Sequence, residues 1–324
     1  MFEREKLPAN RPRATTVRSL FMLQVASALV ADPGWPDKQA WIRLRPQGEG
    51  PWPMNLYASD SPAGIQAVAS GEAQFAIINP AVAAGPAVRG IAPFAEPLPL
   101  RAITTIPSFD QVGLAVSERL GISSLEELAQ RKPALRVSVR GQPDHAVHMV
   151  IGHMLQAAGF SLDDMNAWGG TVRWDTGLPH EPTRTAALKA GELDAMFDEG
   201  IYNWVDLALD NGLRFLSLSE ESLRTLEGMG YRRSVIPKAN FPRLPADVPT
   251  LDFSGFMVYT HAGVPDDAVT AFCAAIDQER ERIPWQGGPS LPLEHMCRDV
   301  PGAPVPIPFH PAAERFWRSR GYLD

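Results

Sequence analysis

Apolar and polar positions follow one another along the chain with the two periods that are typical of strands and helices. Short apolar or alternating runs predict strands at 41–44, 75–78, 102–106, 111–116, 135–139, near Val172, at 195–197 and at 213–216. Apolar residues spaced three and four apart predict helices at 16–31, 61–71, from 124, at 144–158, 183–190 and 202–209. Residues 45–58 and 81–100 are rich in Pro and Gly, and we expect connections there. This β–α alternation predicts a mostly parallel sheet covered by helices.

Two helix boundaries carry clear local signals. Ser124 and Glu127 have the spacing of a capping box at the start of a helix. Asp144 stands in front of the apolar stripe of the 144–158 helix, so we expect it to cap that helix, and Gly159 is expected to end it.

A strand–turn–helix pattern occurs twice. Residues 112–116 precede Gly121 and a capped helix, and residues 255–259 precede Gly263 and a helix from Asp266. This repetition indicates two strands that cross between two lobes, one outbound and one returning. We therefore predict one lobe from residues 1–110 and 259–324 and a second from 111–258. The hinges are then expected at 106–116 and 252–260.

Composition narrows the classes of function. The chain has 324 residues, which suits one bilobal domain or two compact domains, and its formal net charge is -7, which disfavours nucleic acid as a partner. Cys273 and Cys297 are too few for a disulfide framework, and Cys273 is expected to be buried on an apolar helix face. No spacing of Cys and His residues matches a zinc site.

The first residues allow two interpretations. Residues 20–31 form an apolar run behind a basic stretch, as in a secretory signal, but Glu3, Glu5, Pro8 and Pro12 are unusual for one. We interpret the run as the first helix of the fold, which predicts a cytoplasmic protein as the sequence is written. A periplasmic location follows if residues 1–31 are a signal or the N-terminus is misassigned. Twelve residues are too few to span a bilayer, so no membrane insertion is expected.

Ligands in open α/β lobes bind beyond the carboxyl ends of strands and at helix N-termini, and this rule selects loops with polar side chains. Ser59 and Ser61 stand at the start of the 61–71 helix. Their hydroxyl groups have two possible roles there, contact with a ligand or capping of the helix. Asn79 follows an apolar strand and is able to face a cleft or only to form a turn before Pro80.

The start of the 144–158 helix gathers four polar side chains, namely Gln142, Asp144, His145 and His148. His145 and His148 are three residues apart, so both are able to face one direction, where they could titrate near neutral pH or bind a metal. The alternative is an exposed, capped helix start.

Further candidates come from the segment that follows the strand at 195–197 and from the loop expected opposite it. The strand is followed by Asp198, Glu199 and Tyr202. An acid at this position could bind an amine of the ligand or pair with His145. The alternative is that it only stabilises the start of a helix through the helix dipole. Arg173 and Trp174 are expected on the opposite loop, where Arg173 could pair with a carboxylate and Trp174 could stack on a ring. His310 is expected to pack at a helix start rather than to act in catalysis.

Five segments, in the same order, resemble solute receptors of the TAXI family of TRAP transporters. They are GEAQFAIINPAVA (71–83), RAITTIPSFDQVGLAVSERLGISSLEEL (101–128), ALKAGELDAMFDEGIYNWVDLAL (187–209), VPTLDFSGFMVYTHAGVPDDAV (248–269) and PFHPAAERFWRSRGY (308–322). The resemblance covers roughly residues 60–324. It implies a two-lobed, type II periplasmic-binding-protein-like α/β fold with two hinge-crossing strands.

The resemblance also implies a function. Members of that family bind organic acids or similar solutes for an ion-driven transporter, so a small carboxylate is the expected ligand and TRAP membrane subunits are the expected partners. The alternative is a cytoplasmic enzyme on the same fold, a decarboxylase or lyase acting on an aromatic or aliphatic carboxylate. His145, His148 and Glu199 would then supply its acid and base. No cofactor is predicted, and a divalent metal is left open.

Overall fold

The structure is a computed structural model that describes residues 18–30, 39–45, 53–283 and 291–324. The chain divides into two units, residues 1–38 and 39–324, and each is described by itself. The first unit contains α1 (Arg18–Val30), so the apolar run does form a helix. The outermost residues of the predicted 16–31 range lie outside the described residues. No helix in the described ranges is long and apolar enough to cross a membrane.

The second unit begins with a five-stranded sheet. Its order is β1 (Ala40–Leu44), β2 (Met54–Ala58), β3 (Phe75–Ile78), β12 (Phe256–His261) and β4 (Leu100–Ile106). Only β2 and β3 are parallel, and the other pairs are antiparallel. The prediction of a connection over 45–58 was therefore wrong for β2. The Pro and Gly residues of that range stand before Met54 in the chain, so the strand itself contains neither.

A second five-stranded sheet has the order β7 (Thr171–Asp175), β6 (Arg136–Arg140), β8 (Ala195–Asp198), β5 (Gly113–Ser117) and β9 (Leu213–Phe215). β7, β6 and β8 are parallel, whereas β5 is antiparallel to both β8 and β9. β10 (Arg233–Ile236) and β11 (Val248–Leu251) form a separate antiparallel pair. Both sheets are mixed, so the expected mostly parallel sheet was wrong. A strand that crosses out and another that returns place antiparallel members in the sheets they join.

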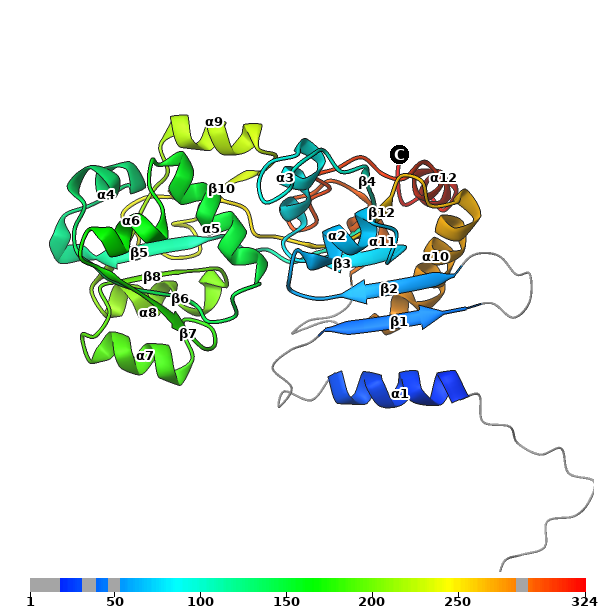
Figure 1. The fold of residues 1–324 in the computed structure, drawn as a ribbon, viewed down its shortest axis with the longest axis horizontal. Helices are drawn as coiled ribbons and strands as arrows, with labels where there is room; N and C mark the ends of the chain where they lie inside the picture. Colours follow the sequence, from blue (N-terminus) through cyan, green and yellow to red (C-terminus); the bar gives the residue numbers. More distant parts are fainter. Residues whose placement is uncertain (1–17, 31–38, 46–52, 284–290) are drawn as a thin grey trace, which may run out of the picture. The chain divides into compact units, whose positions relative to one another are not determined.

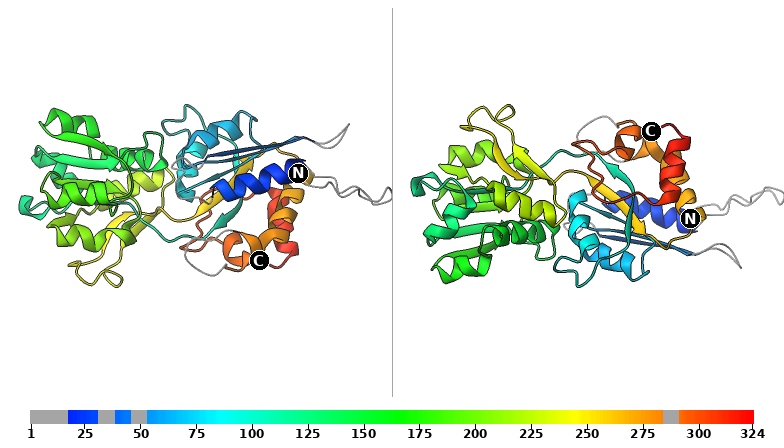
Figure 2. Two further views of the ribbon diagram at one scale, coloured as in Figure 1. Left: turned by 90° about the horizontal axis from the view of Figure 1, so that it is seen from below. Right: turned by 90° about the horizontal axis from the view of Figure 1, so that it is seen from above.

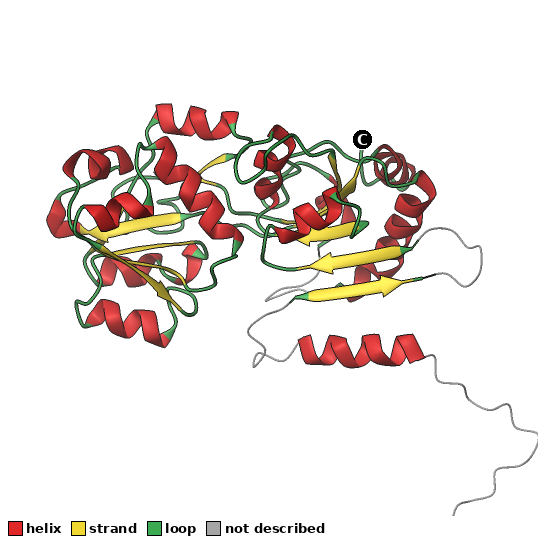
Figure 3. Cartoon of the chain, in the orientation of Figure 1, coloured by secondary structure: helices red, strands yellow, loops and turns green. Residues whose placement is uncertain are grey.

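Helices cover both faces of the second sheet, as Figures 1 and 3 show. Leu114 and Phe197 belong to one apolar core, whereas the neighbouring residues Ala115 and Met196 belong to the other. The first core is closed by α4 (Leu125–Arg131), α5 (Ala146–Ala157), α6 (Leu162–Ala167) and α9 (Glu220–Gly228), and the second by α7 (Pro182–Lys189) and α8 (Val205–Asp210).

The first sheet is covered in the same way. Ala76 packs into one core with α2 (Ala63–Ala69) and α3 (Ala84–Arg89). Phe75 packs into the other core with α10 (Asp266–Glu279), α11 (Leu293–Cys297) and α12 (Pro311–Ser319). Cys273 of α10 is fully buried, as expected. The prediction of a plain connection over 81–100 was wrong for α3, because Pro86 lies in the first turn of that helix, where its missing N–H is not needed.

Two crossing segments run side by side (Figure 2): residues 107–112 join β4 of the first sheet to β5 of the second, and residues 252–255 join β11 to β12 of the first sheet. They run antiparallel, because Val112 N–H donates to Leu251 O at 3.2 Å, Phe253 N–H to Asp110 O at 2.9 Å and Gly255 N–H to Ser108 O at 3.0 Å. The outbound and returning crossings predicted from the repeated pattern are confirmed. The lobe boundaries at 110/111 and 258/259 stay predictions.

Candidate functional site

The site lies at one edge of the second sheet. β6 pairs with β7 so that Arg140 lies opposite Asp175, and β6 and β8 are parallel neighbours with Ser138 opposite Met196. The last residues of all three strands therefore share an edge, the carboxyl edge at which ligands bind in open α/β sheets. β5 starts at the same edge, with Gly113 opposite Asp198, so the first crossing segment brings Asp110 there.

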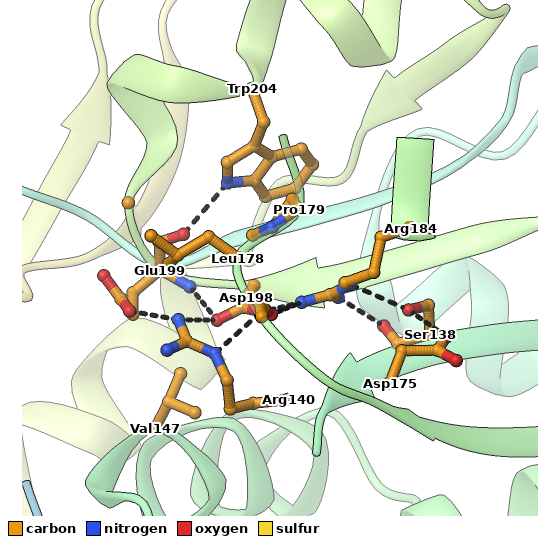
Figure 4. A network of polar contacts seen from close by, with 12 residues as sticks. Ser138, Arg140, Val147, Asp175, Leu178, Pro179, Arg184, Asp198, Glu199 and Trp204 are labelled. Atoms are coloured by element: carbon orange, nitrogen blue, oxygen red, sulfur yellow. Dashed lines mark hydrogen bonds and ion pairs between the residues drawn. The ribbon is translucent and has the colours of Figure 1, made fainter. Parts of the chain in front are cut away.

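A buried ion-pair network occupies this edge (Figure 4). The side chains of Asp198 and Arg184 are 0% exposed and form an ion pair. Arg184, from α7, also donates through Nε to Ser138 Oγ at 3.0 Å and through Nη1 to Gly177 O at 3.1 Å. Ser138 Oγ in turn donates to Asp175 Oδ2 at 2.7 Å. Hydrogen bonds on several sides fix this pair, as a buried ion pair requires.

Arg140 connects this inner network to the surface. Its Nη2 donates to Asp198 Oδ1 at 2.7 Å and also to Glu199 Oε1. The exposed fractions of the Arg140 and Glu199 side chains are 12% and 14%. Burial raises the pKa of the Glu199 carboxyl, and the Arg140 charge opposes that rise. Glu199 thus lies at the edge, as expected, but as the partner of an arginine rather than of His145.

Asp110 joins the network from the crossing segment. Its carboxyl oxygens accept the backbone N–H groups of Gly200 at 2.7 Å and of Ile201 at 3.1 Å, where η3 (Ile201–Asn203) begins. Gly200 has φ 71, a left-handed conformation that glycine adopts at no steric cost. Burial, and next the charge of Glu199, raise the pKa of Asp110 well above its usual value. Two partly buried carboxyls thus lie next to each other between the hinge and the site.

The start of α5 differs from the prediction. His145, not Asp144, caps the helix, since its Nδ1 accepts the N–H of Val147 at 3.1 Å while Asp144 is exposed. Burial, followed by the charge of Arg140, lowers the pKa of His145 to about 4. The imidazole is therefore neutral at pH 7, as an acceptor must be. Asp144 instead accepts from Gln142 Nε2 at 3.1 Å, outside the helix.

His148 has one ring nitrogen engaged and one without a partner. Its Nε2 lies 3.0 Å from Gln142 O, while its buried Nδ1 has no hydrogen-bond partner in the described part of the chain. Burial lowers the pKa of His148. The ring packs against Trp174, with 4.7 Å between the centroids. The two histidines thus share one helix start, but they have different roles.

Arg173 and Trp174 lie in β7, not in a loop. Arg173 pairs with Asp175 at 3.2 Å and with Glu192 at 3.6 Å, so its guanidinium already has two carboxylate partners. Trp174 is 51% exposed, which is a large fraction for a Trp. Trp174 is therefore kept as a candidate contact, whereas Arg173 is engaged by Glu192 and by Asp175, which also accepts from Ser138 of the buried network.

A second exposed aromatic group lies on the other side of Arg140. Tyr202 is 43% exposed and Phe109 is 45% exposed, and their ring centroids are 5.9 Å apart. Asn240 Nδ2 donates to the Tyr202 hydroxyl at 2.9 Å. In the strand order β7-β6-β8-β5, Trp174 belongs to β7 on one side of Arg140, whereas Phe109 and Tyr202 lie on the segments next to β5 and β8 on the other side.

The candidates from the first sheet fall in two places. Ser59 Oγ accepts from Ser61 N at 3.0 Å, and Ser61 Oγ accepts from Ala63 N at 3.2 Å, so both hydroxyls organise the turn before α2. The carbonyl of Asp60, between them, accepts the N–H of Ala146 at 3.0 Å and so joins this turn to the start of α5. Asn79 Nδ2 donates to Gly255 O at 3.1 Å and supports the returning crossing.

Sequence reasoning missed Arg140, Arg184 and Asp110. Arg140 ends a correctly predicted strand, so the carboxyl-edge rule that selected Asp198 could have selected it as well. Arg184 reaches the edge from within a helix, and Asp110 comes from the hinge, so only the folded chain brings them there. His310 caps α12 by accepting the Ala312 N–H at 3.2 Å, as expected of a packing residue.

Neither metal-ligand groups nor surface hollows locate the candidate site. In the described ranges, no group of three or more His, Cys, Asp or Glu side chains is placed to hold a metal ion. Hollows of about 180, 490 and 380 Å³ are lined by residues outside the network, including Phe272, Phe309 and His261. We place the site by its charges and exposed rings rather than by these hollows.

Comparison with known proteins assigns a family. The NMT1-like family model matches residues 58–321, and the chain belongs to this family of solute-binding-type proteins. No curated protein sequence matches the chain. The two sheets, their helical layers and the paired crossings form the two-lobed, type II periplasmic-binding-protein-like α/β fold.

Two solved structures resemble the chain distantly. XAC2383 from Xanthomonas citri, bound to chloride ion, is 12% identical over 79% of this chain and 78% of that one, with a TM-score of 0.39. A TctC solute binding protein from Polaromonas, with no ligand, is 13% identical over 67% and 68%, with a TM-score of 0.34. At such scores these likenesses carry no weight for function.

Proposed function

We propose that the protein is a receptor for a small monocarboxylate with an apolar body, which binds at Arg140. The observation that carries the proposal is the position of this arginine. It ends β6 at the carboxyl edge, keeps 12% of its side chain exposed and already holds the carboxylate of Glu199. A guanidinium that binds one carboxylate in this geometry is suited to bind another.

The exposed rings supply the apolar part of the proposal. Phe109, Trp174 and Tyr202 keep 45%, 51% and 43% of their surface in solvent, beside a network that is otherwise buried. Aromatic surface next to a convergent charged group is typical of a ligand site. A ring or alkyl chain of the ligand would pack against these side chains and remove their exposed apolar surface from water.

The turn at 59–61 is the proposed opposite wall. The hydrogen bond from Ala146 N–H to Asp60 O brings this turn to the start of α5, next to His145. Ser59, Ser61, Gln142, His148 and Tyr202 are proposed to border the ligand, and Asn79 is proposed to act through the hinge. Closure would occur about segments 107–112 and 252–255.

Family membership favours a transporter as the partner and the periplasm as the location. The cytoplasmic location predicted from residues 1–31 gains no support from that membership, whereas the periplasmic alternative agrees with it. The TAXI assignment and the TRAP membrane subunits remain proposals that are finer than the matched family. No observation in the described chain favours the enzyme alternative, because His145 caps a helix and Glu199 pairs with Arg140.

The test is ligand-induced stabilisation. Benzoate, phenylacetate and hexanoate are compared with benzamide, which has the ring of benzoate but no charge. A ligand that binds only the folded state, at a hundredfold excess over its Kd, stabilises that state by about 2.7 kcal/mol. We expect a rise in Tm with at least one of the acids and none with benzamide. A flat response to all three acids would contradict the proposal.

A variant locates the binding. Trp174→Ala removes a half-exposed ring without opening the core, and we expect it to weaken acid binding several-fold. Trp41→Ala is the matched control, since Trp41 is 37% exposed on the first sheet. Equal affinities in the two variants would move the ligand away from β7.

A further inference from the structure

Glu199 is the replaceable partner of Arg140. Asp198 is held by both Arg140 and Arg184 and is 0% exposed, so it is fixed in place. The Glu199 carboxylate, in contrast, is paired with Arg140 and keeps 14% exposure. Its main chain is anchored separately, because Trp204 Nε1 donates to Glu199 O at 2.9 Å. The side chain is therefore able to leave Arg140 while the backbone stays.

We propose that Glu199 occupies the place on Arg140 that the ligand's carboxylate takes, and that Glu199 leaves it with one proton taken up from solvent. This inference rests on the proposed function and names the chemistry of the same site. Arg140 would exchange one carboxylate for another, and its ion pair with Asp198 would remain.

Charge balance requires the proton. Arg140 and Arg184 pair with two carboxylates, those of Asp198 and Glu199, and the carboxyl of Asp110 lies beside Glu199. A bound acid would add a further negative charge to this group. Like charges at such distances repel strongly where water is excluded. Burial already raises the pKa of Glu199 and of Asp110, so both carboxyls take up a proton more readily than in water. Protonated Glu199 carries no charge that competes for the arginine.

The other titratable groups do not supply this charge. Burial lowers the pKa of His145 to about 4 and also lowers the pKa of His148, so both rings are neutral at pH 7. Burial raises the pKa of Tyr202 above its usual value, so its hydroxyl keeps its proton. The charged groups that act on the Glu199 carboxylate are Arg140, Asp198 and Asp110. His145 and His148 lie near Arg140 and Asp198, and Tyr202 lies near Asp110.

The experiment is calorimetric titration with benzoate at pH 7 in phosphate and in Tris, two buffers with different enthalpies of ionisation. For the wild type we expect an uptake of about one proton per ligand bound. We also expect the affinity to fall about tenfold per pH unit above pH 7, as linkage to one proton requires. Glu199→Gln is expected to bind benzoate without proton uptake and with a flat pH profile. Glu118→Gln, at a carboxylate whose side chain is 65% exposed, is the matched control and is expected to resemble the wild type.

The outcomes separate the two proposals. Benzoate binding to the wild type with equal heats in both buffers overturns this inference and leaves the receptor function standing. Full proton uptake in Glu199→Gln also overturns it, because the proton then belongs to another group. If none of benzoate, phenylacetate and hexanoate binds, the proposed function fails and this inference fails with it. The wild-type comparison needs no variant, so it decides even if Glu199→Gln does not fold.

Discussion

At the scale of single residues, the ion pair between Arg184 and Asp198 is the most deeply buried ion pair among the described residues. Both side chains are fully buried; Asp198 is the charge partner of Arg184 and also pairs with Arg140. Arg184→Met would leave Asp198 paired with Arg140 alone. We expect a loss of about 3–5 kcal/mol in the free energy of unfolding, measured with urea, because a buried charge loses a partner.

The control for Arg184→Met is Arg224→Met, which breaks an exposed helical pair with Glu220 at 3.2 Å. Such a pair contributes little in water, so the unfolding midpoint should stay where it is. If Arg184→Met were as stable as the control, the network would not stabilise the fold, and its arginines would have to be explained by ligand binding alone.

At the scale of elements, the start of α5 depends on a histidine that must stay neutral. His145→Ala removes the acceptor of the Val147 N–H and is expected to cost about 1 kcal/mol, whereas His145→Asn keeps an acceptor and should cost less. Urea unfolding at pH 8 measures both variants. Equal losses in the two would show that packing of the ring, not the cap, stabilises the helix start.

The same residue predicts a pH dependence. The pKa of His145 is about 4 in the folded protein and about 6.5 when unfolded, so the unfolded state binds more protons between these values. The stabilisation is complete above pH 6.5 and is lost as pH falls to about 4, by about 3 kcal/mol. The wild type should therefore lose more stability than His145→Asn over this range. Parallel profiles would show that the ring is not buried in this way.

At the scale of the whole molecule, the sequence predicted the strands around the candidate site better than the side-chain contacts made there. Strand 75–78 was predicted with the observed bounds, and the paired crossings followed from a repeated pattern. β2 was missed because Pro and Gly stand before it in the chain, and α3 was missed because Gly85 and Pro86 lie within it. Asp198 and Glu199 were found because they follow a strand, whereas Arg184 pairs with them across the fold, a contact that no local pattern encodes.

The crossing segments carry the last prediction. Asp252 is 3% exposed, its Oδ2 has no hydrogen-bond partner among described residues, and it lies opposite the buried Gln111. Burial raises its pKa to about 6, so the folded state binds more protons than the unfolded one from about pH 4 to 6. Stability is lost as pH rises through this window.

Asp252→Asn removes the buried charge and is expected to be up to about 3 kcal/mol more stable than wild type at pH 8, and equal to it at pH 4. Asp163→Asn, at an exposed position of α6, should show no such difference between the two pH values. Urea unfolding at both pH values measures the difference. If Asp252→Asn were less stable than the wild type at pH 8, the ionised carboxylate would be stabilised in its buried position, and its charge would contribute to the pairing of the two crossing segments.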